Sequence, residues 1–201
     1  MWDQRYSEEG YAYGSTPNDF LKSEYCRIAK GGRVLCLAEG EGRNAVFLAR
    51  EGYSVTAVDQ SAVGLQKAEN LAAECGVSIS TKVSDLAAYE LGYDVWDGIV
   101  SISAHIPSLL RKKVHAQVFS SLKKGGVFIL EAFTVRQLSM EGSGGPPSSQ
   151  KDLFMSLNDL AEELKELEIV LGTEVDRNIS EGKYHQGESA VVQFVANKVV
   201  R

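Results

Sequence analysis

Short apolar runs alternate with amphipathic stretches along most of this chain. Runs rich in Val, Ile and Leu occupy residues 33–37, 54–58, 77–83, 96–102 and 127–130. The stretches between them repeat apolar residues at helical spacing, as Leu65, Ala68 and Ala72 do. Strands that are apolar throughout are buried on both faces, as parallel sheets require. The alternation therefore predicts an α/β fold with a doubly wound, mostly parallel sheet.

The first 30 residues do not follow this alternation. Residues 1–15 have no clear period, whereas Thr16-Pro17-Asn18-Asp19 has the composition of a helix start. That helix is expected to end at Gly31-Gly32. We therefore expect residues 1–30 to form a helical flap attached to the sheet.

The pattern changes again after Thr134. Residues 142–149 read Gly-Ser-Gly-Gly-Pro-Pro-Ser-Ser, which excludes a helix or a central strand. Residues 135–155 are thus expected to form either a lid over the carboxyl edge of the sheet or a plain surface linker. A helix over 156–164 and two strands, 168–175 and 189–196, are predicted to follow, with the strands paired as an antiparallel hairpin.

Composition places the chain among ordinary globular proteins. Its 201 residues suit a single domain spanning 1–201, with 44% hydrophobic and 24% charged residues. A net charge of -6 without any Lys/Arg cluster argues against nucleic acid as a partner. No apolar run approaches the roughly 20 residues that span a bilayer, and the polar N-terminus lacks the apolar core of a signal peptide. We expect a cytoplasmic monomer or homodimer without a metal, since three widely spaced cysteines suggest neither disulfides nor a metal site.

The most informative stretch is a glycine-rich loop between the first strand and the following helix. Gly40 and Gly42, followed by Ala45, fit the G-x-G-x-x-A pattern in which the backbone approaches a ligand at a helix N-terminus. Asp59 ends the second strand, where a carboxylate accepts hydrogen bonds from ribose hydroxyls. This combination predicts an adenosine-containing ligand and leaves NAD, FAD and other such cofactors open.

Acidic residues distinguish between these ligands. Glu39 and Glu41 flank Gly40, and carboxylates there repel a diphosphate but tolerate the cationic sulfonium and ammonium of S-adenosylmethionine. Asp85, just after the third strand, is expected near the adenine and can accept a hydrogen bond from its exocyclic amine. Both features favour S-adenosylmethionine as the cofactor.

With these motifs the chain resembles the class I S-adenosylmethionine-dependent methyltransferases. The resemblance covers nearly the whole chain and rests on the glycine loop, Asp59, Ser84-Asp85-Leu86 and Leu122-Lys123-Lys124-Gly125-Gly126-Val127. More narrowly, the chain is similar to the tellurite-resistance-type and thiopurine-type small-molecule enzymes through Trp2-Asp3-x-Arg5-Tyr6, Tyr11-x-Tyr13-Gly14 and Gly42-Arg43-Asn44-Ala45. The resemblance implies a Rossmann-like, seven-stranded sheet with an antiparallel C-terminal strand, and methyl transfer to a small molecule.

The motifs and the resemblance together predict the site residues. The predicted cofactor-binding residues are Ala38, Glu39, Gly40, Gly42, Asn44, Asp59, Gln60, Ser84, Asp85, Leu86 and Ser101. Two positions depart from the family, because Cys36 stands at its usual acidic position and Ala38 at its first glycine. Glu39 or Glu41 is therefore expected to contact the methionine end of the cofactor. The candidate catalytic residues are His105, beyond the fourth strand, and Tyr13, and a purely structural role is the alternative for each.

Several readings of the chemistry stay open from the sequence. A thiolate or a chalcogen oxyanion needs no general base, so the lack of an obvious catalytic dyad is compatible with methyl transfer. The alternatives are an NAD(P)-binding oxidoreductase and a non-catalytic S-adenosylmethionine sensor that acts through a partner. Arg177 and His185 in the C-terminal hairpin are either ligands for an anionic substrate or solvated loop residues.

Overall fold

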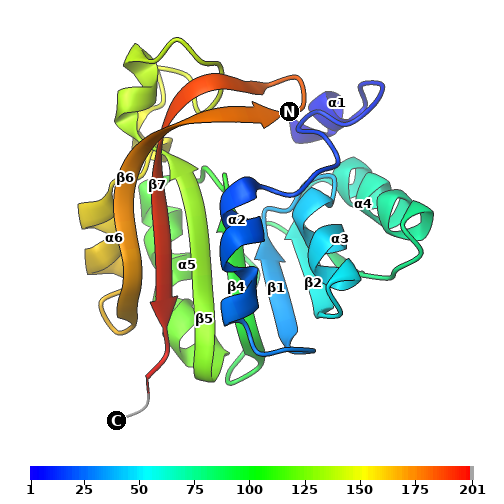
Figure 1. The fold of residues 1–201 in the computed structure, drawn as a ribbon, viewed down its shortest axis with the longest axis vertical. Helices are drawn as coiled ribbons and strands as arrows, with labels where there is room; N and C mark the ends of the chain where they lie inside the picture. Colours follow the sequence, from blue (N-terminus) through cyan, green and yellow to red (C-terminus); the bar gives the residue numbers. More distant parts are fainter. Residues whose placement is uncertain (200–201) are drawn as a thin grey trace.

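The centre of the molecule is a seven-stranded sheet, seen in a computed structural model that describes residues 1–199 (Figure 1). Its strands are β1 (Arg33–Leu37), β2 (Ser54–Asp59), β3 (Ser80–Val83), β4 (Trp96–Ile102), β5 (Leu122–Phe133), β6 (Glu168–Glu181) and β7 (His185–Asn197). They lie in the order β3-β2-β1-β4-β5-β7-β6. The strands β1 to β5 pair in parallel, whereas β7 pairs antiparallel with both β5 and β6. The predicted mostly parallel sheet with an antiparallel C-terminal strand is confirmed.

Helices cover both faces of this sheet (Figure 1). The α-helices are α1 (Trp2–Tyr6), α2 (Asp19–Glu24), α3 (Arg43–Arg50), α4 (Ala62–Glu74), α5 (Ser108–Ser121) and α6 (Leu157–Glu163), and the 3-10 helices are η1 (Tyr25–Arg27), η2 (Val135–Ser139) and η3 (Lys151–Leu153). On one face, Val114 and Val118 of α5 and Leu160 of α6 pack in a common core. On the other face, Leu21 of α2 packs with Leu48 of α3. Both faces are therefore buried, as the uninterrupted apolar runs predicted.

The sheet differs from the prediction in the lengths of four strands. β3 starts at Ser80 rather than at residue 77 and stays largely exposed, because it pairs only with β2 at the sheet edge. β5 begins at Leu122, which pairs with Trp96 just before a bulge. The next residues are lysines and glycines, so the apolar pattern predicts a later start for this strand. β6 and β7 reach Glu181 and His185, so the loop predicted over 176–187 shrinks to 182–184.

The first 30 residues fold into short helices instead of one helix ending at residue 30. Asn18 caps α2, since its Oδ1 accepts a hydrogen bond from the Leu21 N–H at 3.0 Å, and η1 follows directly after Glu24. The predicted helix start is thus two residues early, and α2 ends well before Gly31. Ahead of it, α1 lies where the β6–β7 hairpin bends over the carboxyl ends of the strands (Figure 1). We call residues 1–14 and the hairpin tip 182–184 the roof.

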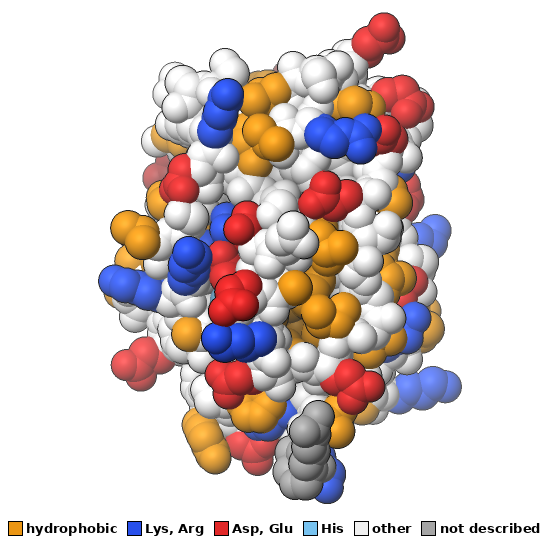
Figure 2. Space-filling view, turned by 90° about the vertical axis from the view of Figure 1, so that its left-hand side faces the viewer, with side chains coloured by type: hydrophobic (Ala, Val, Ile, Leu, Met, Phe, Trp, Pro, Cys, Tyr) orange, Lys and Arg blue, Asp and Glu red, His pale blue; other side chains and the backbone are white. Residues whose placement is uncertain are grey.

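The outer face formed by β6 and α6 is mixed in charge. Figure 2 shows Lys and Arg side chains interspersed with Asp and Glu, with hydrophobic side chains between them. Ile169 and Val170 of the edge strand are 44% and 43% exposed. Every helix within residues 1–199 is too short or too polar to span a membrane.

Candidate cofactor and acceptor site

The glycine-rich loop joins β1 to α3 at the carboxyl edge of the sheet. Gly40 and Gly42 have left-handed backbone angles, with φ of +64° and +90°, and Ala38 has φ of +48°. A Cβ atom on Gly42 would lie 2.5 Å from the Ala68 Cβ, so α4 packs directly against the loop. Glycine is required at this position both for its φ angle and for this close contact.

Asp59 lies against this loop from the end of β2. Its Oδ2 accepts a hydrogen bond from the Gly40 N–H at 2.9 Å, and its Oδ1 accepts one from the Ser61 N–H at 2.8 Å. Burial raises the pKa of the Asp59 carboxyl, and these N–H groups oppose the rise. The spacing in the sequence thus brings Asp59 and Gly40 together, while Gln60 beside them is exposed.

The two glutamates of the loop are engaged differently. Glu39 Oε1 accepts hydrogen bonds from the N–H groups of Asn44 and Ala45, at 2.9 and 2.8 Å, and so occupies the N-terminus of α3. Burial raises the pKa of Glu39 to about 7, although these N–H groups oppose the rise. Its carboxyl also lies beside the buried Cys36 thiol, whose pKa is raised by burial and by Glu39. Glu39 therefore stands next to Cys36, the position at which the methyltransferases that the sequence resembles usually have an acidic residue.

Glu41 and Asn44 are bonded to groups outside the loop. Glu41 Oε1 forms an ion pair with Lys67 at 2.9 Å, and its Oε2 accepts a hydrogen bond from the Ala12 N–H at 2.7 Å. Its charge is neutralised within the protein and is not free for the methionine end. The Asn44 side chain accepts a hydrogen bond from the Asn18 N–H at 2.9 Å and fixes α2 instead.

The residues after β3 and β4 lie at the same edge of the sheet. The Ser84 N–H donates to the Asp59 carbonyl at 2.9 Å, which places Ser84 beside β2. Asp85 is exposed and its Oδ1 accepts a hydrogen bond from the Ala87 N–H at 2.8 Å, whereas Leu86 is buried in the core. Ser101 is buried in β4 and is the register partner of Leu37, the last residue before the loop. Ser84 and Ser101 thus lie at the same sheet edge as the loop, while Leu86 belongs to the core.

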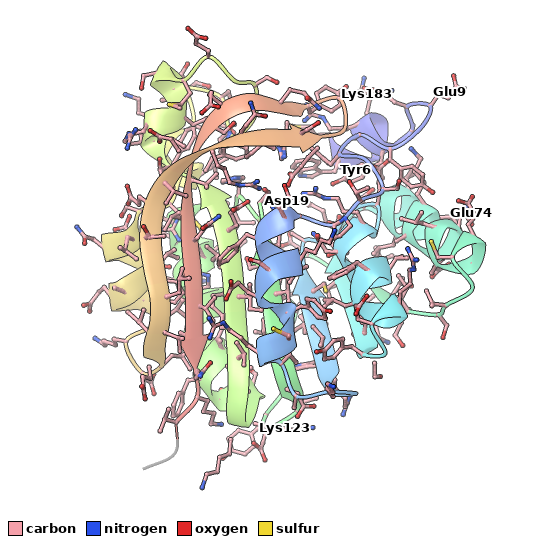
Figure 3. The ribbon with its side chains drawn as sticks, viewed as in Figure 1. Tyr6, Glu9, Asp19, Glu74, Lys123 and Lys183 are labelled. Atoms are coloured by element: carbon pink, nitrogen blue, oxygen red, sulfur yellow. The ribbon has the colours of Figure 1, made fainter. Side chains whose placement is uncertain are left out.

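The roof closes over the loop from above. Lys67 donates to the carbonyl oxygens of Glu8 and Gly10, at 2.8 and 2.7 Å, and holds the N-terminal segment on α4. The hairpin tip joins this segment through the Lys183 N–H, which donates to the Ala12 carbonyl at 2.8 Å. Figure 3 shows Lys183 beside the segment that carries Glu9, and its Nζ donates to the Glu9 carbonyl at 2.8 Å. The N-terminal segment and the hairpin tip thus meet over the site.

A buried network of charged groups lies between the roof and the sheet. Glu181 Oε2 pairs with Arg43 Nη2 at 2.8 Å, and Glu131 Oε1 pairs with Arg177 Nη2 at 2.8 Å. The Asn18 amide bridges them by donating to Glu131 at 2.7 Å and to Glu181 at 2.8 Å. Although burial opposes ionisation, hydrogen bonds from His185 and Arg43 hold the pKa of Glu181 well below its usual range. Arg177 and His185 thus both contact carboxylates, and the Arg177 Nε has no hydrogen-bond partner within residues 1–199.

His105 and Tyr13 border this network. The His105 Nδ1 lies 3.0 Å from the Leu153 carbonyl oxygen, and its Nε2 lies 3.4 Å from the Phe133 N–H. Burial lowers the pKa of His105 to about 4, so the ring is neutral and donates through Nδ1 to the carbonyl. The Tyr13 hydroxyl accepts a hydrogen bond from Arg5 at 2.9 Å, and its ring lies 4.5 Å from that of His185. For His105 to take a proton from an acceptor, its long contact to the Phe133 N–H would have to break.

Three residues outside the predicted set also face the loop. Tyr6 of α1 lies on Gly40, Ser61 caps α4 next to Asp59, and Asp3 accepts a hydrogen bond from the Ser61 hydroxyl. Trp2-Asp3-x-Arg5-Tyr6 stands out in the sequence as a motif, but its distance along the chain from the loop gives no indication of this contact.

Known proteins similar to this chain are methyltransferases and their structural relatives. Residues 34–126, which contain the glycine loop, Asp59 and Ser101, match the family model of a methyltransferase domain. No curated protein matches the chain significantly. A solved S-adenosylmethionine-dependent methyltransferase from Methanosarcina mazei has 19% identity and a TM-score of 0.69, over 88% of this chain and 97% of that one. TehB from Haemophilus influenzae has 20% identity and a TM-score of 0.71, over 90% of this chain and 61% of that one.

Solved structures with this fold also include an enzyme that catalyses a different reaction. The [4+2]-cyclase SpnF has 16% identity and a TM-score of 0.66, over 96% of this chain and 88% of that one. At these identities the likeness establishes the fold and not the substrate. The family-model match is narrower and covers a little under half of the chain. Residues 34–126 are therefore similar to a methyltransferase domain, and the solved Methanosarcina mazei structure of the same fold is an S-adenosylmethionine-dependent methyltransferase.

Proposed function

We propose that this protein is an S-adenosylmethionine-dependent methyltransferase that acts on a small molecule. The observation that carries the proposal is the place of Glu39 at the N-terminus of α3. A diphosphate would bind the N–H groups of Asn44 and Ala45, and both already donate to the Glu39 carboxylate. The site therefore suits an adenosine cofactor that has no phosphate and carries positive charge.

The residues of the site fit the parts of this cofactor. Asp59 is proposed to accept hydrogen bonds from the ribose hydroxyls. The Asp85 Oδ1 accepts a hydrogen bond from the Ala87 N–H, and the other carboxylate oxygen is proposed to accept one from the adenine amine. Glu39 is proposed to contact the methionine ammonium beside Cys36. When bound, the cofactor would supply a methyl group to an acceptor nucleophile, with the CH3–S bond breaking and S-adenosylhomocysteine as the leaving group.

The methyl acceptor is proposed to bind below the roof, where the ionisable side chains are already engaged and are poorly placed to act as a general base. Among residues 1–199, Glu131 and Glu181 are ion-paired, His105 is neutral and held by backbone groups, and Tyr13 is hydrogen-bonded to Arg5. A nucleophile that is already deprotonated needs no base, which favours a thiolate or a chalcogen oxyanion. In this proposal His105 acts as a positioning residue between β5 and the segment before α6.

Residues 135–155 are proposed to serve as a lid on the acceptor side. The segment is held at its middle, where the Gly142 N–H donates to the Glu188 carbonyl at 3.0 Å and Ser143 bridges to Gln186. Gly144 and Gly145 then pass closely over the Phe133 ring. The few backbone contacts of this segment to β7 make it the part of the acceptor side that opens most easily.

Two experiments test the proposal. Equilibrium binding by calorimetry compares S-adenosylhomocysteine with NADH, and uptake of NADH alone would establish the rival oxidoreductase reading. Formation of S-adenosylhomocysteine is then followed with thiols, selenite, tellurite and small aromatic acceptors. Asp59→Ala, which loses the proposed ribose ligand, is the inactive control. Cofactor binding without turnover of any acceptor would instead favour a sensor that acts through a partner.

A further inference from the structure

The Tyr6 ring is wedged between two glycines at the edge of the cofactor loop. A Cβ atom on Gly40 would lie 2.6 Å from the Tyr6 Oη, and one on Gly64 would lie 2.8 Å from the ring carbon Cδ2. Tyr6 is only 5% exposed, although it belongs to a five-residue helix near the start of the chain. Neither glycine could carry a side chain without displacing the ring, so the loop and the start of α4 leave room for this tyrosine.

Two contacts from α1 hold Tyr6 in this place. The Trp2 ring stacks on the Tyr6 ring with centroids 5.7 Å apart. Asp3 accepts a hydrogen bond from the Ser61 hydroxyl, and the Ser61 N–H in turn donates to Asp59 at 2.8 Å. The helix that carries Tyr6 is thereby anchored to the same short segment that orients the Asp59 carboxylate.

The Tyr6 hydroxyl makes no hydrogen bond within residues 1–199, yet it is not one of the fully sealed unpaired polar atoms of that range, which belong to Arg43, Arg177 and Asn197. It touches Gly40, whose N–H is bonded to Asp59, so the hydroxyl and the carboxylate meet at one glycine. Burial, with the negative charges of Asp59 and Glu41 nearby, raises the pKa of Tyr6, and the hydroxyl stays protonated. A neutral phenol can both donate and accept a hydrogen bond.

We infer that the Tyr6 hydroxyl forms part of the ribose-binding site of the cofactor, opposite Asp59. Asp59 accepts from ribose hydroxyls and Tyr6 supplies the donor that a carboxylate cannot. Binding of the ribose would therefore complete the closure of α1 over the loop. This inference rests on the proposed use of S-adenosylmethionine.

The test uses Tyr6→Phe, which keeps the ring between the two glycines and removes only the hydroxyl. Binding is measured by calorimetry with two probes, S-adenosylhomocysteine and 5′-methylthioadenosine, which lacks the amino acid but keeps the ribose. We expect Tyr6→Phe to weaken both by the same factor, about 2- to 10-fold for one neutral hydrogen bond. The thermal stability of the ligand-free protein is expected to stay unchanged, since the hydroxyl has no protein partner.

Tyr25→Phe is the matched control, because its hydroxyl bonds the exposed Glu51 at 2.9 Å on another part of the molecule. This variant is expected to bind both probes as the wild type does. The inference is overturned if Tyr6→Phe binds both probes normally, or if it weakens S-adenosylhomocysteine alone, which would place the hydroxyl at the amino-acid end. A clear loss of ligand-free stability would overturn it too, since it would reveal a protein partner. Failure of the wild type to bind S-adenosylhomocysteine would instead contradict the proposed function.

Discussion

Removal of the Asp59 carboxylate is expected to weaken cofactor binding and to loosen the glycine loop at the same time. The two carboxylate oxygens accept hydrogen bonds from Gly40 and Ser61, at 2.9 and 2.8 Å, and each keeps a lone pair for a ribose hydroxyl. Hydrogen bonds to a charged group contribute about 1.5–3 kcal/mol. Asp59→Ala is therefore expected to raise the dissociation constant for S-adenosylhomocysteine about 10- to 150-fold.

Calorimetry measures this change, and urea unfolding of the ligand-free protein measures the effect on the loop. Asp59→Asn keeps one oxygen for an N–H group, so it is expected to lose less stability than Asp59→Ala. Asp176→Asn removes an exposed carboxylate paired with Arg136 on the hairpin and controls for the change in net charge. Unchanged affinity in a folded Asp59→Ala protein would refute the assignment of Asp59 to the cofactor site. An equal loss in Asp176→Asn would trace the effect to net charge.

Measurable effects are expected at three further residues, namely Glu39, Glu163 and Gly42. With the pKa of Glu39 raised to about 7, affinity for S-adenosylhomocysteine, whose ammonium group Glu39 is proposed to contact, should fall about tenfold from pH 8 to pH 6. Glu39→Gln should flatten this dependence in calorimetry. Because this pKa lies above that of the unfolded chain, the stability that protonated Glu39 provides should be lost as pH rises toward 7. Glu163→Ala should lower the free energy of unfolding by about 3–5 kcal/mol in urea, since it leaves Arg111, bonded to it at 2.8 Å, as an unpaired buried charge. Although burial of Glu163 opposes its ionisation, His115 and Arg111 lower its pKa to about 2. The stability that this cluster provides should therefore be lost as pH falls from about 4.5 toward 2. A free energy of unfolding that stays constant over this range would contradict the pairing. Gly42→Ala should destabilise the protein by at least about 1–3 kcal/mol in the same assay, because its Cβ would lie 2.5 Å from Ala68 at a left-handed φ.

The fold was predictable wherever a strand is buried on both faces. β1, β2 and β4 lie in the parallel part of the sheet, and their apolar runs mark them without regard to their partners. The edge strands carry polar residues on one face, which is why β3 was placed too early and the end of β6 was taken for a loop. In 176–181 exposed residues alternate with less exposed ones, but the latter include the half-buried Arg177 and the buried Glu181, whose positions depend on ion pairs across the molecule.

The site was predictable where its contacts are local. Gly40 and Asp59 meet because β1 and β2 are adjacent parallel strands, and adjacent strands end at the same edge. The direction of Glu41 was not predictable, because Lys67 and Ala12 reach it from other parts of the chain. The same holds for Asn44, which is bonded to Asn18 in the N-terminal segment. Side chains whose partners lie far away in sequence leave no periodic signal.

The cofactor loop and the acceptor side are connected by two routes of direct contact. Arg43 follows Gly42 in the chain and pairs with Glu181 at 2.8 Å, which lies next to the hairpin tip. By the second route, Glu41 bonds the Ala12 N–H and the Ala12 carbonyl accepts from the Lys183 N–H. A shift of the loop or of α3 would therefore move the hairpin tip, and opening of the tip would strain the loop. In the proposed site, opening of the roof for ligand exchange would break these contacts, so exchange of the cofactor would be coupled to exchange of the acceptor.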